Sequence, residues 1–306
     1  MTQTRKSQGQ KAKSATSDAE REIKKIGRQH DFRMAKSLGQ NFLTDQSVIE
    51  RIVAASEAGS ADLVIEIGPG MGVLTREAAE AAGKVVAIEV DARLIPILRS
   101  TLALSGNVVV VHEDVMKTDI QELIRRERTL SDGTEAEHVR IVGNLPYYIT
   151  TPILMKLLEE RLDISSITIM VQKEVAERIA SPPGSRTYGA LSVAVQYFCD
   201  VEYVVDVPKE VFIPVPKVDS AVLHLRLRSE PPVDLLSEKL FFDCVKKSFG
   251  QRRKTLHNAL TGVCGLDKQQ TGELLLACGI DPARRAETLS LSEFAALANR
   301  LAQPGL

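Results

Sequence analysis

Short runs of β-branched residues alternate with stretches of helical periodicity from about Gln40 onward, and this alternation restricts the fold more than any other feature of the chain. Apolar strands separated by helices are typical of a parallel sheet that helices cover on both faces. We therefore predict a doubly wound α/β fold. The expected strands lie at 63–67, 85–88, 108–111, 140–143, 166–171, 201–207 and 221–228.

The pattern changes towards both ends of the chain and predicts three regions. Residues 1–30 are polar, basic and nearly without large apolar side chains, so they cannot offset the entropy of folding and are expected to form a flexible arm. An α/β domain is expected at 31–230. Asp45 is the expected cap of its first helix. The last two strands of this domain suggest an antiparallel pair at the sheet edge. Helical patterns then predict a small helical domain at 231–306.

Composition and spacing exclude several classes of protein. The longest apolar stretches are far shorter than the roughly 20 residues of a membrane-spanning helix, so we expect no membrane partner. The four cysteines lack C-x-x-C spacing and the five histidines do not fall at metal-ligand offsets, so we expect reduced thiols and no metal. No apolar segment follows the basic N-terminus, which disfavours a secretory signal and suggests the cytoplasm.

Positive charge is concentrated in two segments, although the formal net charge is only -1. Residues 1–36 contain ten Lys or Arg and four Asp or Glu, and residues 246–257 contain five Lys or Arg and no acid. Such a cluster on one short helical segment favours contact with nucleic-acid phosphate, and the alternative is a solvated helix face. The predicted phosphate-binding residues are Lys246, Lys247, Arg252, Arg253 and Lys254.

A glycine-rich loop follows the first strand and reads Glu-Ile-Gly-Pro-Gly-Met-Gly at 66–72. Glycines at a strand-to-helix turn let the backbone approach a ligand. A dinucleotide site would have G-x-G-x-x-G spacing, whereas this loop has G-x-G-x-G and an acid, Glu66, two positions before Gly68. The pattern favours S-adenosyl-L-methionine, which has no phosphate, at Glu66, Gly68 and Gly70. A tight turn without a ligand is the alternative.

Two acidic residues at the ends of the next strands support a cofactor site at the same sheet edge. Glu89 ends the second strand about 20 residues after the loop, where an acid can accept both ribose hydroxyls. Asp114 follows the third strand, near the expected position of the adenine amino group. A solvated charge at Glu89 and a helix cap at Asp114 are the alternatives for each residue taken singly.

The fourth strand ends in Asn144-Leu145-Pro146-Tyr147, a motif that suits methyl transfer to an aromatic amine. The lone pair of such an amine is delocalised into the ring, so the amine is a poor nucleophile. The side-chain carbonyl of Asn144 and a backbone carbonyl fixed by Pro146 can accept both amine hydrogens, and Tyr147 can stack on a flipped base. A strand-end turn with a core tyrosine is the alternative.

Seven segments give the chain a resemblance to a known family over nearly its whole length after the arm. They lie at 37–43, 66–72, 144–153, 171–176, 188–193, 212–220 and 249–256. In these segments the chain resembles the KsgA family of small-subunit ribosomal RNA adenine dimethyltransferases. The resemblance implies a Rossmann-like, seven-stranded methyltransferase sheet with a helical C-terminal domain. It does not extend to the arm or to an insertion at 131–138.

The resemblance also implies roles for individual residues. The methionine part of the cofactor would contact Gln40, Asn41 and Leu43, and its backbone-facing side would contact Gly68. The ribose would contact Glu89, and the adenine would contact Asp114 and Val115. Asn144 and Leu145 would hold the target amine, and Tyr147 with Phe212 would sandwich the extruded adenine. The implied substrate is a pair of adjacent adenosines near the 3′ end of small-subunit ribosomal RNA. The implied partner is the assembling small ribosomal subunit, which the chain would bind as a monomer.

Three other functions remain possible at this point. A large-subunit ribosomal RNA methyltransferase that confers antibiotic resistance shares the loop and the catalytic motif, although 188–193 and 246–256 resemble the small-subunit family better. A non-catalytic ribosome-assembly factor would retain the fold without activity, which the intact motif residues disfavour. A nicotinamide-dependent oxidoreductase is disfavoured by the loop spacing.

Overall fold

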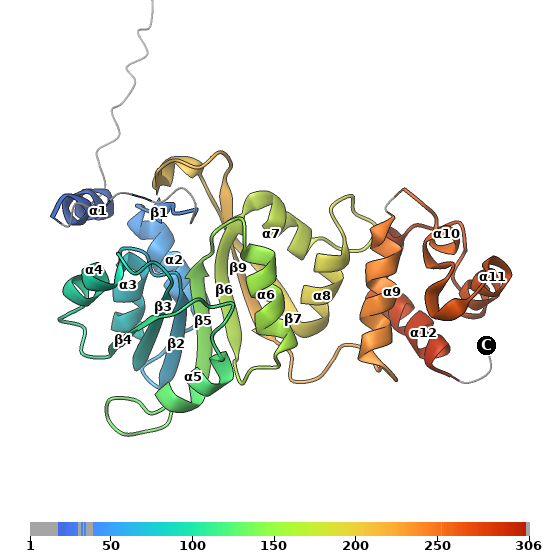
Figure 1. Ribbon diagram of the computed structural model, residues 1–306, viewed down its shortest axis with the longest axis horizontal. Coiled ribbons are helices and arrows are strands. Elements are labelled where there is room, and N and C mark those ends of the chain that lie inside the picture. Colours follow the sequence, from blue (N-terminus) through green and yellow to red (C-terminus); the bar gives the residue numbers. More distant parts are fainter. Residues whose placement is uncertain (1–17, 30–31, 33, 35–38, 252, 304–306) are drawn as a thin grey trace, which may run out of the picture.

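The computed structural model describes residues 18–29, 32, 34, 39–251 and 253–303 of the chain. In this part of the chain the main sheet has seven strands (Figure 1), and every strand expected from the sequence is present within two residues of its predicted bounds. The strands are β2 (Asp62–Ile67), β3 (Lys84–Glu89), β4 (Val108–His112), β5 (His138–Asn144), β6 (Ser166–Gln172), β7 (Cys199–Val207) and β9 (Ser220–Leu227).

The strand order across the sheet is β4-β3-β2-β5-β6-β9-β7. The first five strands run parallel, and β9 pairs antiparallel with both β6 and β7. The predicted antiparallel pair at the sheet edge is therefore confirmed. Because β2 lies between β3 and β5, the carboxyl ends of four neighbouring strands open towards one crevice, where doubly wound proteins bind ligands.

Helices cover both faces of the sheet because alternate strand residues point to opposite sides. On β2, Leu63 and Ile65 share a core cluster with α5 and α6, whereas Val64 shares another with α2 and α3. The Asp45 side chain accepts hydrogen bonds from two backbone N–H groups of α2, which confirms the predicted cap. The helices of this part are α2 (Gln46–Ser56), α3 (Val73–Ala81), α4 (Ile95–Thr101), α5 (Ile120–Glu127), α6 (Thr150–Glu159), α7 (Lys173–Ala180) and α8 (Ala190–Phe198).

The C-terminal part is helical, as expected, and lies beyond α8 at one end of the molecule (Figure 1). Tyr197 and Phe198 of α8 contact Phe241 and Phe242 of α9 with ring centroids 5.3–5.7 Å apart, so this part shares a core with the sheet domain. The division at residue 230 stays a prediction. The helices are α9 (Glu238–Gly250), α10 (Leu256–Leu260), α11 (Lys268–Ala277) and α12 (Leu291–Ala302), and short 3-10 turns are η2 (Lys209–Val211), η3 (Val263–Gly265) and η4 (Ala286–Thr288).

The expected flexible arm is wrong for residues 18–29, which form helix α1 (Asp18–Gln29). Ile23 and Ile26, three positions apart, are only 1% and 6% exposed and pack with Phe42 and Leu94. Two isoleucines on one helix face are enough to stabilise α1, because they pack on apolar side chains of the rest of the folded chain. Residues 1–17 and 30 of the predicted arm lie outside the described part.

A second, two-stranded sheet joins segments far apart in sequence. It pairs β1 (Phe42–Leu43) with β8 (Phe212–Ile213) in antiparallel register, so that Leu43 lies opposite Phe212. The Thr44 backbone N–H also donates to the Val211 carbonyl oxygen over 2.8 Å. This pairing holds the segment at 39–43 beside the main sheet. Among the described residues no helix is long and apolar enough to cross a membrane.

Candidate functional site

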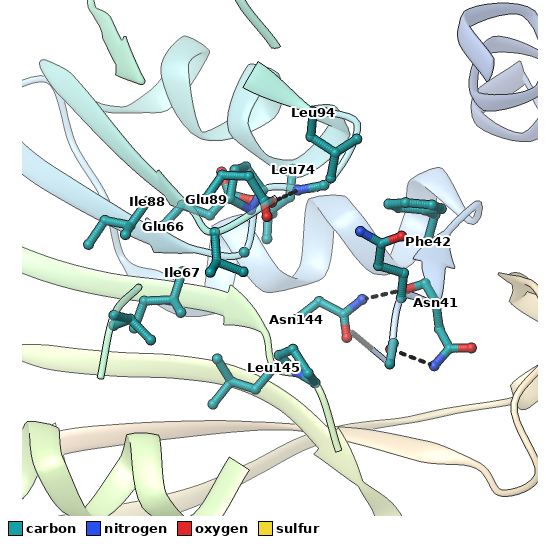
Figure 2. Close-up of a pocket in the computed structure, with 18 of the residues that line it drawn as sticks. Asn41, Phe42, Glu66, Ile67, Leu74, Ile88, Glu89, Leu94, Asn144 and Leu145 are labelled. Atoms are coloured by element: carbon teal, nitrogen blue, oxygen red, sulfur yellow. Dashed lines mark hydrogen bonds between the residues drawn. The ribbon is translucent and has the colours of Figure 1, made fainter. Parts of the chain in front are cut away.

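A cavity of about 330 Å³ lies where the carboxyl ends of β2, β3, β4 and β5 meet the segment at 39–43 (Figure 2). Its walls include every residue that the sequence predicted for the cofactor. These residues are Gln40, Asn41, Leu43, Glu66, Gly68, Gly70, Glu89, Asp114, Val115 and Asn144. The volume is within the usual range for small-molecule sites.

The glycine loop needs glycine for two reasons. Gly68 and Gly70 have φ angles of +72° and +59°, in the left-handed region that favours glycine. A Cβ atom on Gly70 would also lie only 2.8 Å from the Phe42 ring. The Gly68 backbone N–H donates to the Ile88 carbonyl oxygen over 3.0 Å, which fixes the loop against the end of β3.

Glu89 is held in one orientation by two backbone groups. Its Oε1 accepts from the Asp91 N–H over 2.8 Å, and its Oε2 accepts from the Gly70 N–H over 3.3 Å. Burial raises the pKa of this carboxyl. The side chain therefore joins the loop to the end of β3 and presents a preorganised acceptor to the cavity.

Glu66 is the most deeply buried acid of the site, with 1% of its surface exposed. Burial raises its pKa to about 8. Its Oε2 accepts no hydrogen bond from any described residue, although it lies in the cavity wall. A buried polar atom without a partner is costly, so this atom fits a site that a polar ligand completes.

Asp114 caps a turn and also lines the cavity. Its Oδ1 accepts from the Met116 N–H over 3.0 Å, which caps the turn after β4. The residue is only partly buried and also lines the cavity, next to the buried side chain of Val115.

A polar contact that the sequence did not predict ties the segment at 39–43 to the end of β3. Gln40 Nε2 donates to Asp91 Oδ2 over 2.8 Å, and Arg93 Nη2 donates to the same oxygen over 2.6 Å. The Arg93 guanidinium holds the Asp91 pKa below its usual range and lies 5.1 Å from the centre of the Phe32 ring. The signal for Asp91 was present, because it is an acid two positions after Glu89 at the same strand end.

The side chain of Asn144 is oriented by the same segment. Its Nδ2 donates to the Asn41 backbone carbonyl oxygen over 3.0 Å (Figure 2). Because the amide nitrogen is bound there, the opposite atom of the amide, Oδ1, remains to accept a hydrogen bond in the cavity.

The backbone of the motif restricts which carbonyl can serve as the second acceptor. The Pro146 carbonyl oxygen already accepts from the Ile149 N–H and from Thr150 Oγ1, both over 3.1 Å. A carbonyl oxygen has two lone pairs, so both lone pairs of the Pro146 oxygen are already used. The Leu145 carbonyl, which directly precedes the proline, is therefore the better candidate for the second acceptor.

Two adjacent tyrosines lie at the cavity and differ in their freedom. Tyr147 is half-buried, and its hydroxyl hydrogen-bonds Ser220 Oγ over 2.6 Å. Tyr148, which the sequence analysis did not assign to the site, is 61% exposed and lines the cavity. Its ring is so near Gly39 that a Cβ atom there would lie 3.2 Å away.

Phe212 does not lie where the predicted aromatic sandwich requires it. The ring is 1% exposed, does not line the cavity, and packs in the core with Leu43 and Val48. The expected open sandwich with Tyr147 is therefore wrong for this structure. The physical reason is the pairing of β8 with β1, which directs this side chain into the core.

The predicted basic cluster is divided between a helix and a turn. Lys246 and Lys247 are exposed near the end of α9, which ends at Gly250, and Lys247 lies in its last turn. Arg253 and Lys254 are exposed in the turn before α10. The expectation of one continuous helical segment is wrong because the backbone leaves the helix at Gln251. Arg252 lies outside the described residues.

Comparisons with known proteins agree over most of the chain. Residues 31–303 match the family model described as ribosomal RNA adenine dimethylase. The chain is 49% identical over 276 residues to ribosomal RNA small subunit methyltransferase A of Clostridioides difficile (strain 630), covering 90% of this chain and 93% of that protein. It is 50% identical over 281 residues to the protein of the same name from Bacillus cereus (strain B4264), covering 91% and 94%.

Two solved structures share the fold at lower identity. A dimethyladenosine transferase from Plasmodium falciparum superposes with a TM-score of 0.69 at 25% identity, covering 84% of this chain and 95% of that chain. The 23S rRNA methyltransferase ErmE superposes with a TM-score of 0.64 at 28% identity, covering 86% and 100%.

Proposed function

This chain belongs to the ribosomal RNA adenine dimethylase family, and from that premise we propose that it dimethylates the 6-amino groups of two adjacent adenosines near the 3′ end of small-subunit ribosomal RNA. The observation that carries the proposal is the meeting of the acid-flanked glycine loop and the Asn144–Tyr147 motif in one cavity. The first feature suits the methyl donor and the second suits an adenine amine.

The residues of the cavity fit S-adenosyl-L-methionine, whose sulfonium supplies an activated methyl group when it is bound. The unpartnered Oε2 of Glu66 suits a polar ligand, and the fixed carboxylate of Glu89 suits the ribose hydroxyls that this ligand carries. Glu89 would accept from the ribose, and Asp114 with Val115 would contact the adenine. The residues proposed to hold the methionine part and the loop side are Gln40, Asn41, Leu43, Glu66, Gly68 and Gly70.

Asn144 and Leu145 would act on the substrate amine. The Asn144 Oδ1 and the Leu145 carbonyl would accept its two hydrogens and localise the lone pair for in-line displacement. Because both acceptors are fixed before the substrate arrives, they need little reorganisation during the reaction. Tyr147 would stack on the extruded base.

Ribosomal RNA is the substrate, and we propose that its context is the assembling small ribosomal subunit. The chain would act there as a monomer in the cytoplasm. Identity of about one half to small-subunit methyltransferases, against 28% to ErmE, favours the small subunit over the large one. The intact Glu66, Glu89 and Asn144 disfavour a purely non-catalytic assembly factor.

Mass spectrometry of ribosomal RNA tests this function. Small- and large-subunit RNA are digested separately from cells with the gene, without it, and complemented with Asn144→Ala. We expect dimethyladenosine in small-subunit RNA only with the intact gene. Loss of a methyl mark from large-subunit RNA instead would support the alternative substrate, and unchanged RNA would contradict the proposed activity.

A further inference from the structure

Tyr147, the last residue of the motif, and its neighbour Tyr148 differ in how they are held. Tyr148 is 61% exposed, whereas the Tyr147 hydroxyl lies 2.6 Å from Ser220 Oγ. A stacking ring works best when its plane is set before the base arrives, because positioning then costs no further ordering. The Tyr147 ring is anchored at both ends, by the chain at its Cα and by Ser220 at its hydroxyl.

Ser220 is a rigid anchor because of its place in the sheet. It is fully buried at the first residue of β9, between two other strands. Its register partners are Gln172 of β6 on one side and Val207 of β7 on the other. Neither strand is part of the cofactor crevice, so the anchor lies outside the elements that contact the cofactor.

The neighbouring acid does not compete for this role. Asp219 Oδ1 accepts from the Lys209 backbone N–H over 3.0 Å, and the Asp219 carbonyl oxygen accepts from the Lys173 N–H over 3.0 Å. Both bonds fix the turn that leads into β9. Burial and the nearby Asp219 raise the pKa of Tyr147, so the phenol stays neutral and keeps its hydrogen bond at neutral pH.

We propose that Ser220 is a positioning residue: through its hydrogen bond to the Tyr147 hydroxyl it fixes the phenol ring in the plane that stacks on the target adenine. This inference rests on the proposed function and adds a residue to its machinery. It also gives a role to the sequence segment at 212–220, whose Phe212 is buried away from the cavity.

A double-mutant cycle tests the role. Single-turnover methyl transfer to small-subunit particles from cells lacking the gene is measured for the parent, Ser220→Ala, Tyr147→Phe and the double variant. Both single variants break the same hydrogen bond from opposite ends. At saturating particle we expect each to transfer about tenfold more slowly than the parent, and the double variant to be no slower than the slower single variant.

Two matched controls separate positioning from general packing. Ser56→Ala removes another buried serine hydroxyl, which donates to the Val53 carbonyl oxygen over 2.6 Å. Tyr203→Phe removes a phenol hydroxyl that donates to Asp206 Oδ1 on the edge strand β7. We expect both controls to transfer at the parent rate. We also expect Ser220→Ala to keep the parent's affinity for S-adenosyl-L-methionine and its thermal midpoint, within the range of the controls.

The outcomes separate this inference from the proposed function. If the parent is active and Ser220→Ala transfers at the same rate, the inference alone is overturned. If the rate losses multiply in the double variant, the two residues act independently. If Ser220→Ala loses both thermal stability and cofactor affinity, its role is structural. Either result also overturns the inference. A parent that transfers no methyl group to the particles overturns the proposed function and this inference with it.

Discussion

Backbone groups fix the direction of the two side chains on which binding and transfer are proposed to depend. Glu89 accepts from two N–H groups, and Asn144 donates to the Asn41 carbonyl oxygen. The two bonds of Glu89 hold both of its carboxylate oxygens in place, and the bond of Asn144 Nδ2 leaves Oδ1 as the atom that can accept in the cavity. Small changes at these residues should therefore have separable effects on cofactor binding and on methyl transfer.

Glu89→Ala should weaken the binding of S-adenosyl-L-methionine. Losing a charged acceptor of the ribose hydroxyls should cost about 1.5 to 3 kcal/mol of binding free energy. Titration calorimetry measures this directly, with Glu122→Ala as a control, because that exposed acid lies on α5 and pairs with Arg125. A dissociation constant equal to the parent's would refute the assignment.

Asn144→Ala should slow methyl transfer while leaving cofactor affinity nearly unchanged. Removing one preorganised acceptor costs roughly a hundredfold to a thousandfold in rate. Single-turnover transfer, with the products resolved as mono- and dimethyladenosine, is the measurement. Asn299→Ala, which removes an amide bonded to the Asp234 carbonyl oxygen in the helical part, is the control. Dimethyladenosine formed at the parent rate would contradict the mechanism.

Glu66 should make the stability of the cofactor-free protein depend on pH. Burial raises its folded-state pKa from 4.5 to about 8, so between these values the folded chain holds a proton that the unfolded chain has released. The bound proton therefore contributes to the free energy of unfolding. This contribution is fully present below the pKa that Glu66 has in the unfolded chain, and it is lost as pH rises through about 8. The parent's free energy of unfolding, measured by urea titration relative to Glu66→Gln, should therefore fall over this window. A difference independent of pH would contradict the argument.

The secondary-structure elements followed closely from the sequence, and the exceptions have physical causes. The strands were predictable because buried parallel strands are continuous β-branched runs. The small sheet of β1 and β8 was not, because two-residue strands have no periodicity and form only when distant segments meet. The buried position of Phe212 and the contact of Gln40 with Asp91 depend on the same long-range meeting. The site residues at the strand ends could be predicted, because their positions follow from where each strand ends along the sequence.

Helix α1 should depend on its two isoleucines. Ile23→Ala removes a side chain that is 1% exposed, and such a truncation typically costs about 2 to 5 kcal/mol. We expect faster amide hydrogen exchange in α1, because a peripheral helix can open separately from the sheet. Lys25→Ala, at an exposed position of the same helix, is the control. Unchanged exchange in the Ile23 variant would mean that other contacts hold the helix.

The whole molecule presents exposed cations on the helical part, which are proposed to bind RNA phosphate. Replacing Lys246 and Lys247 by Ala should weaken binding to ribosomal particles and reduce the slope of log affinity against log salt by about one to two units. Lys239 and Lys268 form the matched control pair, because both are exposed in the same helical part. An unchanged slope would assign the cluster to a solvated surface.

The sheet has a second end, and its separation from the site has a practical use. The turn at 131–135 is exposed and precedes β5, so it lies at the amino ends of the strands, opposite the cavity. Its backbone is closed locally, since the Leu130 N–H donates to the Thr134 carbonyl oxygen over 2.8 Å. A fluorophore or affinity handle attached at Ser131 would therefore lie on a face that neither the proposed cofactor nor the proposed flipped base needs to reach.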